Sequence, residues 1–314
     1  MMDVEVSILC MAYNHGKYIR QTLESMVSQK TDFPFEILIN DDASTDNTAE
    51  IIREYSEKYP DIVKPIFQKE NQYSKGINIQ NTFNIPRAQG KYLAYCEGDD
   101  YWTDEYKLQK QVDFMKKHPD CTLCIHNAVR VDTNGNVIGD FSKIKYDGEV
   151  SCEQVIAGGG GFCATNSIMA PAELLKNRPD YFDIMSYDFV IQMYLASCGK
   201  TYCMPETMSA YRVAVENSWT SRMKKNPEKY KEHILKTETV RRAFDECTGF
   251  KYHDVIESVI VKNRYNILYQ EGNYKALLKE PYKNCKEAQN KSWRVKTKIF
   301  IGARFPFLLK LFRM

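Results

Sequence analysis

The sequence lacks any apolar run long enough to cross a membrane. A spanning helix needs about 18 or more predominantly apolar residues, and no stretch of the 314-residue chain approaches this length. Net charge is also nearly absent: 43 basic and 41 acidic side chains leave a formal charge of +2, which gives no reason to expect a nucleic-acid partner. We expect a globular protein of one or two domains with a large core.

The features of an exported protein are missing too. The N-terminal segment MMDVEVSILC carries acidic residues where a signal peptide has a basic region. The ten cysteines show no regular spacing, which favours reduced thiols over a disulfide framework. No internal repeat or low-complexity segment is visible, and we expect a cytoplasmic protein.

Strand and helix patterns alternate through the first 100 residues. Continuous apolar runs predict buried strands, and apolar residues at helical spacing predict the helices between them. This β-α-β-α-β pattern is typical of a mostly parallel sheet covered by helices. Asn47 and Glu50 have the spacing of a capping box at the start of the second helix. We expect strands at residues 4–13, 35–40, 63–68 and 91–97, and helices at residues 16–29 and 48–59.

The alternation loosens after Trp102. Asn134 and Gly135 form a typical hairpin turn, and residues after about 225 read as helical and rich in Lys, Glu and Tyr. We expect a helix at 104–117, a strand at 121–131, a helix near 186–199 and a short strand pair ending at 208–213. The expected parts of the chain are a domain at 1–224, a helical extension at 225–290 and a C-terminal tail at 291–314.

Three carboxylates follow the strand expected at 91–97. Glu97, Asp99 and Asp100 repel one another unless a positive charge lies between them. Carboxylates two residues apart can face one cation, and Mg²⁺ or Mn²⁺ commonly bridges protein carboxylates and a diphosphate. Gly98 leaves room for a ligand close to the backbone. The alternative is a solvated acidic turn that caps the next helix.

A second acidic pair, Asp41 and Asp42, ends the strand expected at 35–40. Ligands of such sheets bind at the carboxyl ends of the strands, where a carboxylate can accept hydrogen bonds from a nucleobase N–H or a ribose hydroxyl. The ordinary alternative is a turn and helix cap, which Asp, Ser and Thr form routinely. Tyr13, at the end of the first strand, could stack on a nucleobase or cover the core.

Four segments resemble, in order and spacing, the family 2 glycosyltransferases. They are VSILCMAYN (6–14), ILINDDASTDNT (37–48), GKYLAYCEGDDYW (90–102) and YDFVIQMYLASCGKTYCMPETMSAYRV (187–213). The resemblance covers roughly residues 4–215, and the order of the motifs is more specific than any one of them. It implies the GT-A fold, a single Rossmann-like mixed α/β sheet that is flanked by helices and binds a nucleotide sugar. A helical C-terminal extension would follow this domain.

The resemblance also implies roles for single residues. It places the sugar donor at Ala12, Tyr13, Asn14, Asp41, Asp42, Glu97, Gly98, Asp99 and Asp100. Asp42 would accept from the base N–H, while Asp99, with Glu97 at the first position of the Asp-x-Asp motif, would hold Mg²⁺ or Mn²⁺. Asp188 would be the general base that takes the proton of an acceptor hydroxyl, a role that typically contributes ~10²–10⁴ in rate. An ordinary carboxylate at a helix start is the alternative for Asp188.

One residue of the family pattern is missing. Many relatives carry a His after the Tyr-Arg pair, where this chain has Ala214. Glu216, Asn217 or a water could substitute, or the loop could be shifted. His126 suits a core or pocket wall better than metal ligation, because no second ligand lies at metal spacing. The four glycines at 158–161 fit either a mobile lid at the acceptor site or a wide turn.

The C-terminal residues 291–314 carry seven basic side chains and no acidic one. This composition suits a segment that lies on a membrane surface, here the inner face of the cell membrane. The alternative is a terminal helix that packs on the domain with a solvated basic face, and Pro306 would break any single helix. The apolar side chains of the segment include Ile299, Phe300, Phe305, Leu308 and Phe312.

The sequence therefore predicts an inverting glycosyltransferase that moves a sugar from a UDP-sugar to a hydroxyl of a surface-glycan or lipid-linked saccharide. A non-catalytic protein that binds nucleotide sugars or glycans is the alternative from another class. A sugar nucleotidyltransferase is less favoured, since its first loop is usually Gly-rich and bears Arg or Lys, whereas MAYNHGKY contains only Gly16. A dehydrogenase is disfavoured because no GxGxxG motif follows a strand.

Overall fold

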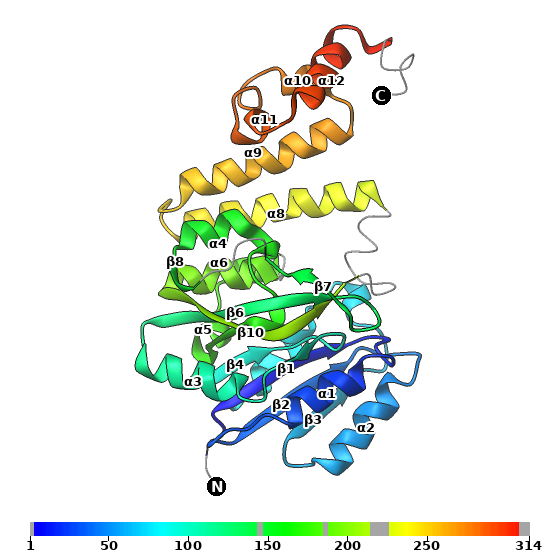
Figure 1. The fold of residues 1–314 in the computed structure, drawn as a ribbon, viewed down its shortest axis with the longest axis vertical. Helices are drawn as coiled ribbons and strands as arrows, with labels where there is room; N and C mark the ends of the chain where they lie inside the picture. The colour runs from blue at the N-terminus through cyan, green and yellow to red at the C-terminus, as the bar shows by residue number, and fades with distance from the viewer. Residues whose placement is uncertain (1–2, 143–146, 185–187, 214–225, 308–314) are drawn as a thin grey trace. The chain divides into compact units, whose positions relative to one another are not determined.

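The computed structural model describes residues 3–142, 147–184, 188–213 and 226–307. The chain divides into two compact units, Met1–Arg222 and Met223–Met314. The first unit is a sheet covered by helices, and the second is helical in its described residues (Figure 1).

One mixed sheet organises the first unit. Its strands are β1 (Val6–Ala12), β2 (Phe35–Asp41), β3 (Val63–Phe67), β4 (Tyr92–Tyr95), β5 (Tyr101–Trp102), β6 (Cys121–Val131), β7 (Val137–Asp140), β8 (Gly148–Val150), β9 (Met169–Pro171) and β10 (Lys200–Arg212). Their order is β3-β2-β1-β4-β9-β6-β10-β5, with β7 paired to β6 and β8 to β10. The four strands from β3 to β4 are parallel, whereas β9 runs antiparallel to β4 and β6. The predicted mixed sheet is confirmed.

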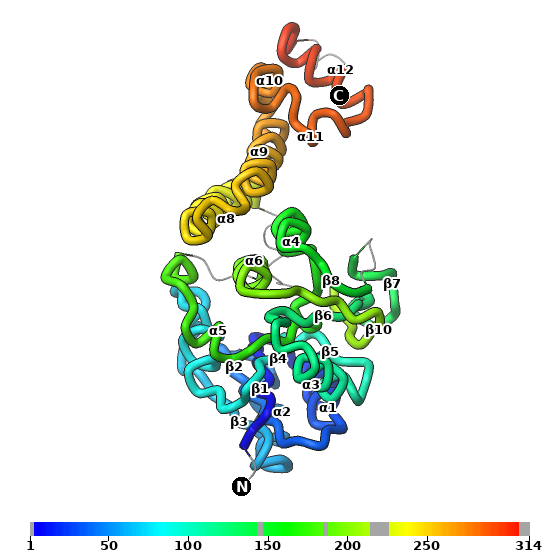
Figure 2. Tube along the Cα trace, turned by 90° about the vertical axis from the view of Figure 1, so that its left-hand side faces the viewer, coloured from blue at the N-terminus to red at the C-terminus, as the bar shows by residue number. Residues whose placement is uncertain are grey.

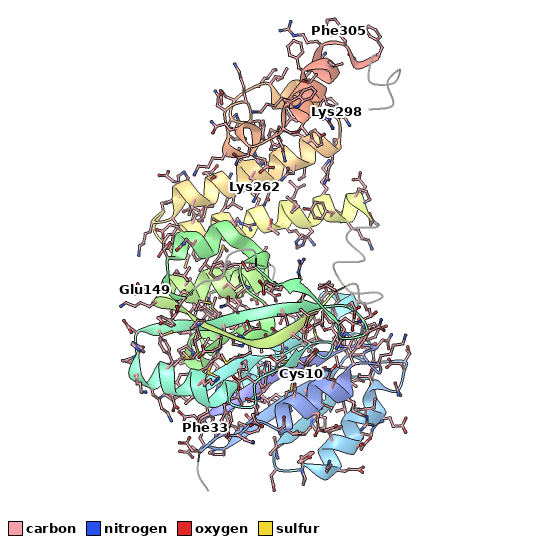
Figure 3. The ribbon with its side chains drawn as sticks, viewed as in Figure 1. Cys10, Phe33, Glu149, Lys262, Lys298 and Phe305 are labelled. Carbon is pink, nitrogen blue, oxygen red and sulfur yellow. The ribbon has the colours of Figure 1, made fainter. Side chains whose placement is uncertain are left out.

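Helices cover the sheet, and strands that are buried on both faces have nearly continuous apolar sequences, as in β1. The helices of this unit are α1 (Ile19–Val27), α2 (Thr48–Lys58), α3 (Lys107–Lys117), α4 (Cys152–Gly158), α5 (Ala172–Lys176) and α6 (Asp188–Cys198). The buried side chains of α1, α2 and α3 pack on one core cluster with those of β1 and β2, and Figure 3 labels Cys10 of this cluster. None of the ten cysteines, all within the described residues, forms a disulfide, including the close pair Cys121 and Cys124 in β6.

Two local predictions are wrong. Asn47 makes no side-chain cap bond; instead Asp46 Oδ1 accepts from the N–H and the hydroxyl of Thr48, at 3.0 and 2.5 Å. Asp46 is better placed because its other carboxylate oxygen also holds Gly16 N–H (2.9 Å). The expected strand pair is a single strand, β10. It pairs with β6 along its whole length, and shifts in the register of the pairing take the place of the expected turn.

The second unit consists of two long helices and three short ones in its described part. They are α8 (Pro227–Cys247), α9 (His253–Gln270), α10 (Tyr274–Leu277), α11 (Lys286–Gln289) and α12 (Trp293–Arg304). The short helices gather around the C-terminal end of α9 (Figure 2), where Tyr265, Leu277 and Ile299 form a small core. α12 ends before Pro306, as predicted. Within the described ranges no helix combines the length and apolar character needed to span a bilayer.

Candidate active site

Three loops meet at the carboxyl edge of the parallel strands. β1 lies between β2 and β4 and is parallel to both, so the residues after each strand emerge at the same edge. Backbone hydrogen bonds join them directly: Asp42 N–H donates to Ala12 O, and Gly98 N–H donates to Met11 O, each at 2.9 Å. The structure thus brings the predicted sugar-donor residues of all three loops together.

The loop after β1 is tied to the loop after β2. Asn14 has a left-handed backbone (φ 55°), donates its N–H to Ser44 Oγ (2.9 Å) and accepts from Thr45 N–H at Oδ1 (2.8 Å). Asn14 therefore uses these groups as a brace within the protein. Ala12 is fully buried, whereas Tyr13 is 40% exposed and presents its ring at this edge.

Asp41 and Asp42 have different surroundings. Asp42 accepts backbone N–H bonds at both carboxylate oxygens, from Gln72 (2.7 Å) and Tyr73 (3.1 Å). Asp41 accepts a long bond from Ser44 N–H (3.3 Å), and its Oδ1 is buried without a hydrogen-bond partner among the described residues. Burial raises the pKa of Asp41, against the effect of its hydrogen bonds with Ser44. Of the two carboxylates, only that of Asp41 has an oxygen without a hydrogen-bond partner among the described residues.

Asp100 belongs to the framework of the site. Its buried carboxylate accepts from Arg212 N–H at Oδ1 (2.7 Å) and from Asn166 Nδ2 at Oδ2 (3.1 Å). Its carbonyl oxygen accepts from the Thr22 hydroxyl (2.6 Å). These bonds connect the loop after β4 to α1, to β10 and to the 3-10 turn η5 (Thr165–Ser167). The protein itself already uses both carboxylate oxygens of Asp100.

Arg212, the last residue of β10, holds the same loop by its backbone and side chain. Its Nε donates to Asp99 O (2.9 Å), and another guanidinium nitrogen donates to Gln21 Oε1 (2.8 Å). The guanidinium carbon lies 4.6 Å from the centre of the Tyr18 ring, within the range of a cation–π contact. Arg212 therefore fixes the position from which the Asp99 carboxylate projects.

Asp188 joins the acid cluster from a distant part of the chain. It begins α6, and its Oδ2 accepts from the Thr165 hydroxyl at 2.5 Å. Burial raises the pKa of Asp188, and the Thr165 hydrogen bond opposes this rise. Burial also raises the pKa of Glu97 well above its usual range, with the negative charges of Asp188 and then Asp99 adding to the effect. The three carboxylates thus share one electrostatic neighbourhood.

Glu97 and Asp99 have the ligand chemistry of a divalent-cation site. Their oxygens are the ligands that Mg²⁺ and Mn²⁺ prefer, and a cation beside them would offset the repulsion that raises the pKa of Glu97. No Lys or Arg side chain forms an ion pair with either carboxylate within the described residues. The same residues contain no group of three or more His, Cys, Asp and Glu side chains arranged to hold a metal. Further ligands would be diphosphate oxygens and water, as is usual for Mg²⁺.

Other predicted features lie outside this cluster. Ala214, Glu216 and Asn217 fall outside the described residues. His126 is buried and lines a small cavity with residues of β6 and of the segment after α4, so the prediction of a core or pocket-wall histidine is confirmed. Of the glycines at 158–161, the last three form a short 3-10 turn (η4).

Comparisons with known proteins point to one family. A model of glycosyl transferase family 2 matches residues 7–176. A protein of Mycobacterium tuberculosis is 36% identical over 222 residues, which make up 69% of this chain but only 61% of that relative, less than two thirds of its length. WfaP of Escherichia coli, named UDP-Glc:alpha-D-GlcNAc-diphosphoundecaprenol beta-1,3-glucosyltransferase, is 37% identical over 111 residues, or 35% of this chain and 41% of that one.

Among solved structures, TarS 1–349 of S. aureus in complex with UDP-GlcNAc superposes on this chain with a TM-score of 0.64. The superposition covers 96% of this chain and 82% of TarS 1–349, at 18% sequence identity. At this low identity the likeness establishes the fold alone, and it confirms the GT-A fold that the motifs implied.

Proposed function

Because this chain belongs to glycosyl transferase family 2, we propose that it is an inverting enzyme that moves a sugar from a UDP-sugar to a hydroxyl of a surface-glycan or lipid-linked saccharide. The observation that carries this proposal is that Asp188 begins α6 with its carboxylate held by Thr165, and that its negative charge, with that of Asp99, helps to raise the pKa of Glu97. Inverting transfer needs a base for the attacking hydroxyl and charge stabilisation for the leaving diphosphate on opposite sides of the sugar. The cluster offers residues for both.

Asp188 is the proposed base. The Thr165 hydroxyl holds one carboxylate oxygen, so the carboxylate is oriented before an acceptor arrives. As the acceptor oxygen attacks the anomeric carbon, Asp188 takes its proton. Burial raises the pKa of Asp188, which makes the ionised carboxylate a stronger base than a solvated Asp.

Glu97 and Asp99 are the proposed ligands of Mg²⁺ or Mn²⁺ and, through it, of the diphosphate of the sugar donor. A bound divalent cation supplies charge stabilisation for the leaving nucleoside diphosphate. Arg212 supports this by fixing the backbone of Asp99 (2.9 Å). We assign Glu97 a ligand role despite its length, because its carboxylate lacks any hydrogen bond from a described side chain that would hold it elsewhere.

The nucleoside is assigned to the loops after β1 and β2. The exposed ring of Tyr13 can stack on a base. Asp41 has a carboxylate oxygen without a partner among the described residues, so we assign it the base N–H, and Asp42 then braces the loop at Gln72 and Tyr73. This assigns to Asp41 the role that the resemblance implied for Asp42.

The names of two similar proteins support the proposed nucleotide and acceptor class. WfaP is named for transfer from UDP-Glc to a diphosphoundecaprenol-linked saccharide, and TarS 1–349 was solved with UDP-GlcNAc. Both names support a uridine nucleotide for this chain, and the first supports an acceptor attached to a lipid.

A surface of α12 would bring the enzyme to such a lipid. The helix packs on the small core of its unit through Val295 and Ile299, so its opposite side is left to solvent. The exposed aromatic side chains of this segment are Trp293, Phe300, Phe305 and Phe307, and Figure 3 labels Phe305 beyond the end of α12.

Basic side chains accompany these aromatic rings. The guanidinium carbons of Arg294 and Arg304 lie 5.7 and 5.5 Å from the ring centres of Trp293 and Phe300. Aromatic and basic side chains on one helix face are typical of a segment that lies in an anionic membrane interface, where each basic residue contributes about 1 kcal/mol. We propose peripheral membrane contact through residues 291–314; residues 308–314, with Leu308 and Phe312, fall outside the described part of the chain.

A thermal-shift panel of UDP-, GDP-, dTDP- and CMP-sugars, each with Mn²⁺ and with EDTA, tests the proposal. A ligand that binds only the folded state raises the melting temperature. At a ligand concentration of 100 times its Kd, the free energy of unfolding increases by about 2.7 kcal/mol. We expect the largest shift with a UDP-sugar and Mn²⁺. A UDP-sugar that raises the melting temperature but is never consumed would identify a binding protein instead of an enzyme.

A further inference from the structure

His15 occupies a fixed position between the loop after β1 and the acid cluster. Its carbonyl oxygen accepts from the N–H groups of Tyr18 and Ile19 (2.8 Å each), which sets the turn into α1. On either side of it, Asn14 and Gly16 are bonded to the loop that follows β2. The backbone therefore has little freedom, and the fold fixes the position from which the His15 side chain projects.

The His15 ring faces Asp99 without bonding to it. Nε2 lies 3.9 Å from Asp99 Oδ2, beyond the 2.7–3.2 Å of a typical N–H···O hydrogen bond. Both side chains are mostly buried, with 17% and 19% of their surface exposed. Within the described residues no other hydrogen bond or ion pair to the Asp99 carboxylate occurs. A buried imidazole and a carboxylate thus face each other across a gap that no described residue bridges with a hydrogen bond.

Gly98 provides the space for this ring. A Cβ atom on residue 98 would lie 2.7 Å from His15 Nδ1 and 3.0 Å from the Cβ of Ala12, closer than packed atoms allow. The position of the His15 ring in this structure therefore requires a glycine at residue 98. The sequence suggested that Gly98 left room for a ligand; the structure fills that room with the imidazole.

The surroundings of Nδ1 indicate where the ring carries its proton. Nδ1 is buried and has no hydrogen-bond partner in the part of the chain that the structure describes. Buried N–H groups without an acceptor are rarer than buried acceptors without a donor, which favours the tautomer with its proton on Nε2. The N–H of that tautomer points toward the Asp99 side of the ring, where a ligand oxygen could accept it.

We propose that His15 binds the diphosphate of the sugar donor by donating its Nε2–H to an oxygen of the second (β) phosphate, held next to Asp99. The inference rests on the proposed transferase function. A diphosphate at Asp99 brings anionic oxygens to an N–H that has no acceptor among the described residues, and a hydrogen bond to a charged group is stronger than a neutral one. His15 then recognises the phosphates and not the nucleoside.

Calorimetry with UDP and UMP in the presence of Mn²⁺ tests this proposal on the full chain. His15→Leu removes the N–H donor while keeping an apolar side chain of moderate size, and His15→Gln places an amide N–H near the original Nε2. His118→Leu is the matched control, because His118 is an exposed histidine stacked on Phe114 (ring centres 4.3 Å apart). The readout is the ratio of UDP affinity to UMP affinity within each variant.

We expect His15→Leu to lower this ratio by about 10-fold or more, since a hydrogen bond to a charged group contributes at least that factor. His15→Gln should recover part of the ratio, and His118→Leu should leave it at the wild-type value. An unchanged ratio overturns the proposal, as does equal weakening of UDP and UMP, which would mean that His15 only supports the loop. If the wild-type chain binds neither UDP nor any other nucleoside diphosphate, it is the transferase function that fails.

Discussion

Replacing Asp188 by Asn removes the proposed base while keeping the contact that holds it. The Thr165 hydroxyl, 2.5 Å from Asp188 Oδ2, can donate to an Asn amide oxygen in the same place, so the site should keep its shape. We expect transfer to fall by ~10²–10⁴, which corresponds to about 3–5 kcal/mol on the barrier. Affinity for the UDP-sugar should hardly change, because a base acts mainly in the transition state. Steady-state release of UDP and calorimetric binding of the sugar donor measure the two effects separately.

The stability of the same variant supplies an independent check. Burial raises the pKa of Asp188 above its ordinary value of 3.8, so the folded protein binds this proton more tightly than the unfolded chain. The protonated Asp188 side chain therefore stabilises the folded state at a pH below the pKa of Asp188 in the unfolded chain. This stabilisation is lost as the pH rises through the pKa of Asp188 in the folded protein. At neutral pH the ionised side chain therefore costs stability that Asn does not cost. Asp188→Asn should melt at the wild-type temperature or above it.

The pH dependence of wild-type transfer follows from the same shift. The base must be ionised, so the rate should fall as the pH drops through the raised pKa of Asp188, at a higher pH than an ordinary Asp would give. The pKa of Glu97 is also raised, so protonation of Glu97 can contribute to the same fall in rate. The pH dependence of the residual rate of Asp188→Asn measures that contribution. Wild-type turnover in Asp188→Asn would refute the assignment of the base.

Two further predictions concern binding. Asp99→Asn should weaken Mn²⁺-dependent binding of UDP by at least ~10-fold with the fold intact. If calorimetry gives the wild-type chain the same UDP affinity in EDTA as in Mn²⁺, a role of the metal in UDP binding is excluded. Trp293→Ala with Phe300→Ala should reduce co-sedimentation with anionic vesicles at low salt, whereas Phe250→Ala, which alters a side chain that is 60% exposed elsewhere in the same unit, should not. Equal vesicle binding by all variants would leave α12 as a packed terminal helix only.

The structure also changes how the membrane prediction should be tested. Deleting the chain after Asn290 would remove Ile299, which is 5% exposed and belongs to the core of the second unit. A loss of binding after that deletion could reflect unfolding. Substitutions of exposed Trp293 and Phe300 leave that core in place.

Local patterns were enough to predict most of the sheet and the place of the site. The strands at 35–41, 63–67 and 121–131 are apolar runs that can be recognised from local sequence alone. Their limits agree with the expected limits to within one residue. The acidic loops follow from the same patterns, because the parallel order of β1, β2 and β4 places their ends side by side.

Long-range contacts account for what the sequence did not predict. Thr165 and Asp188 are separated by 23 positions, and no pattern in either segment indicates that they meet. Asp100 resembles its neighbour Asp99 in the sequence, yet its bond to Arg212 N–H, 112 positions away, makes it part of the framework. His15 was visible in the motif after Tyr13, but only the fold shows that its ring faces Asp99.

The most direct test of the account follows the anomeric carbon of the sugar. The full chain is incubated with Mn²⁺ and UDP-glucose, UDP-galactose or UDP-GlcNAc, whose sugars are α-linked, and slow hydrolysis by water is monitored by proton NMR before the free sugar equilibrates. An inverting transferase with Asp188 as its base releases the β-anomer first, together with UDP. Release of the α-anomer, cleavage to a sugar 1-phosphate, or no cleavage of any of these UDP-sugars would contradict the proposed reaction.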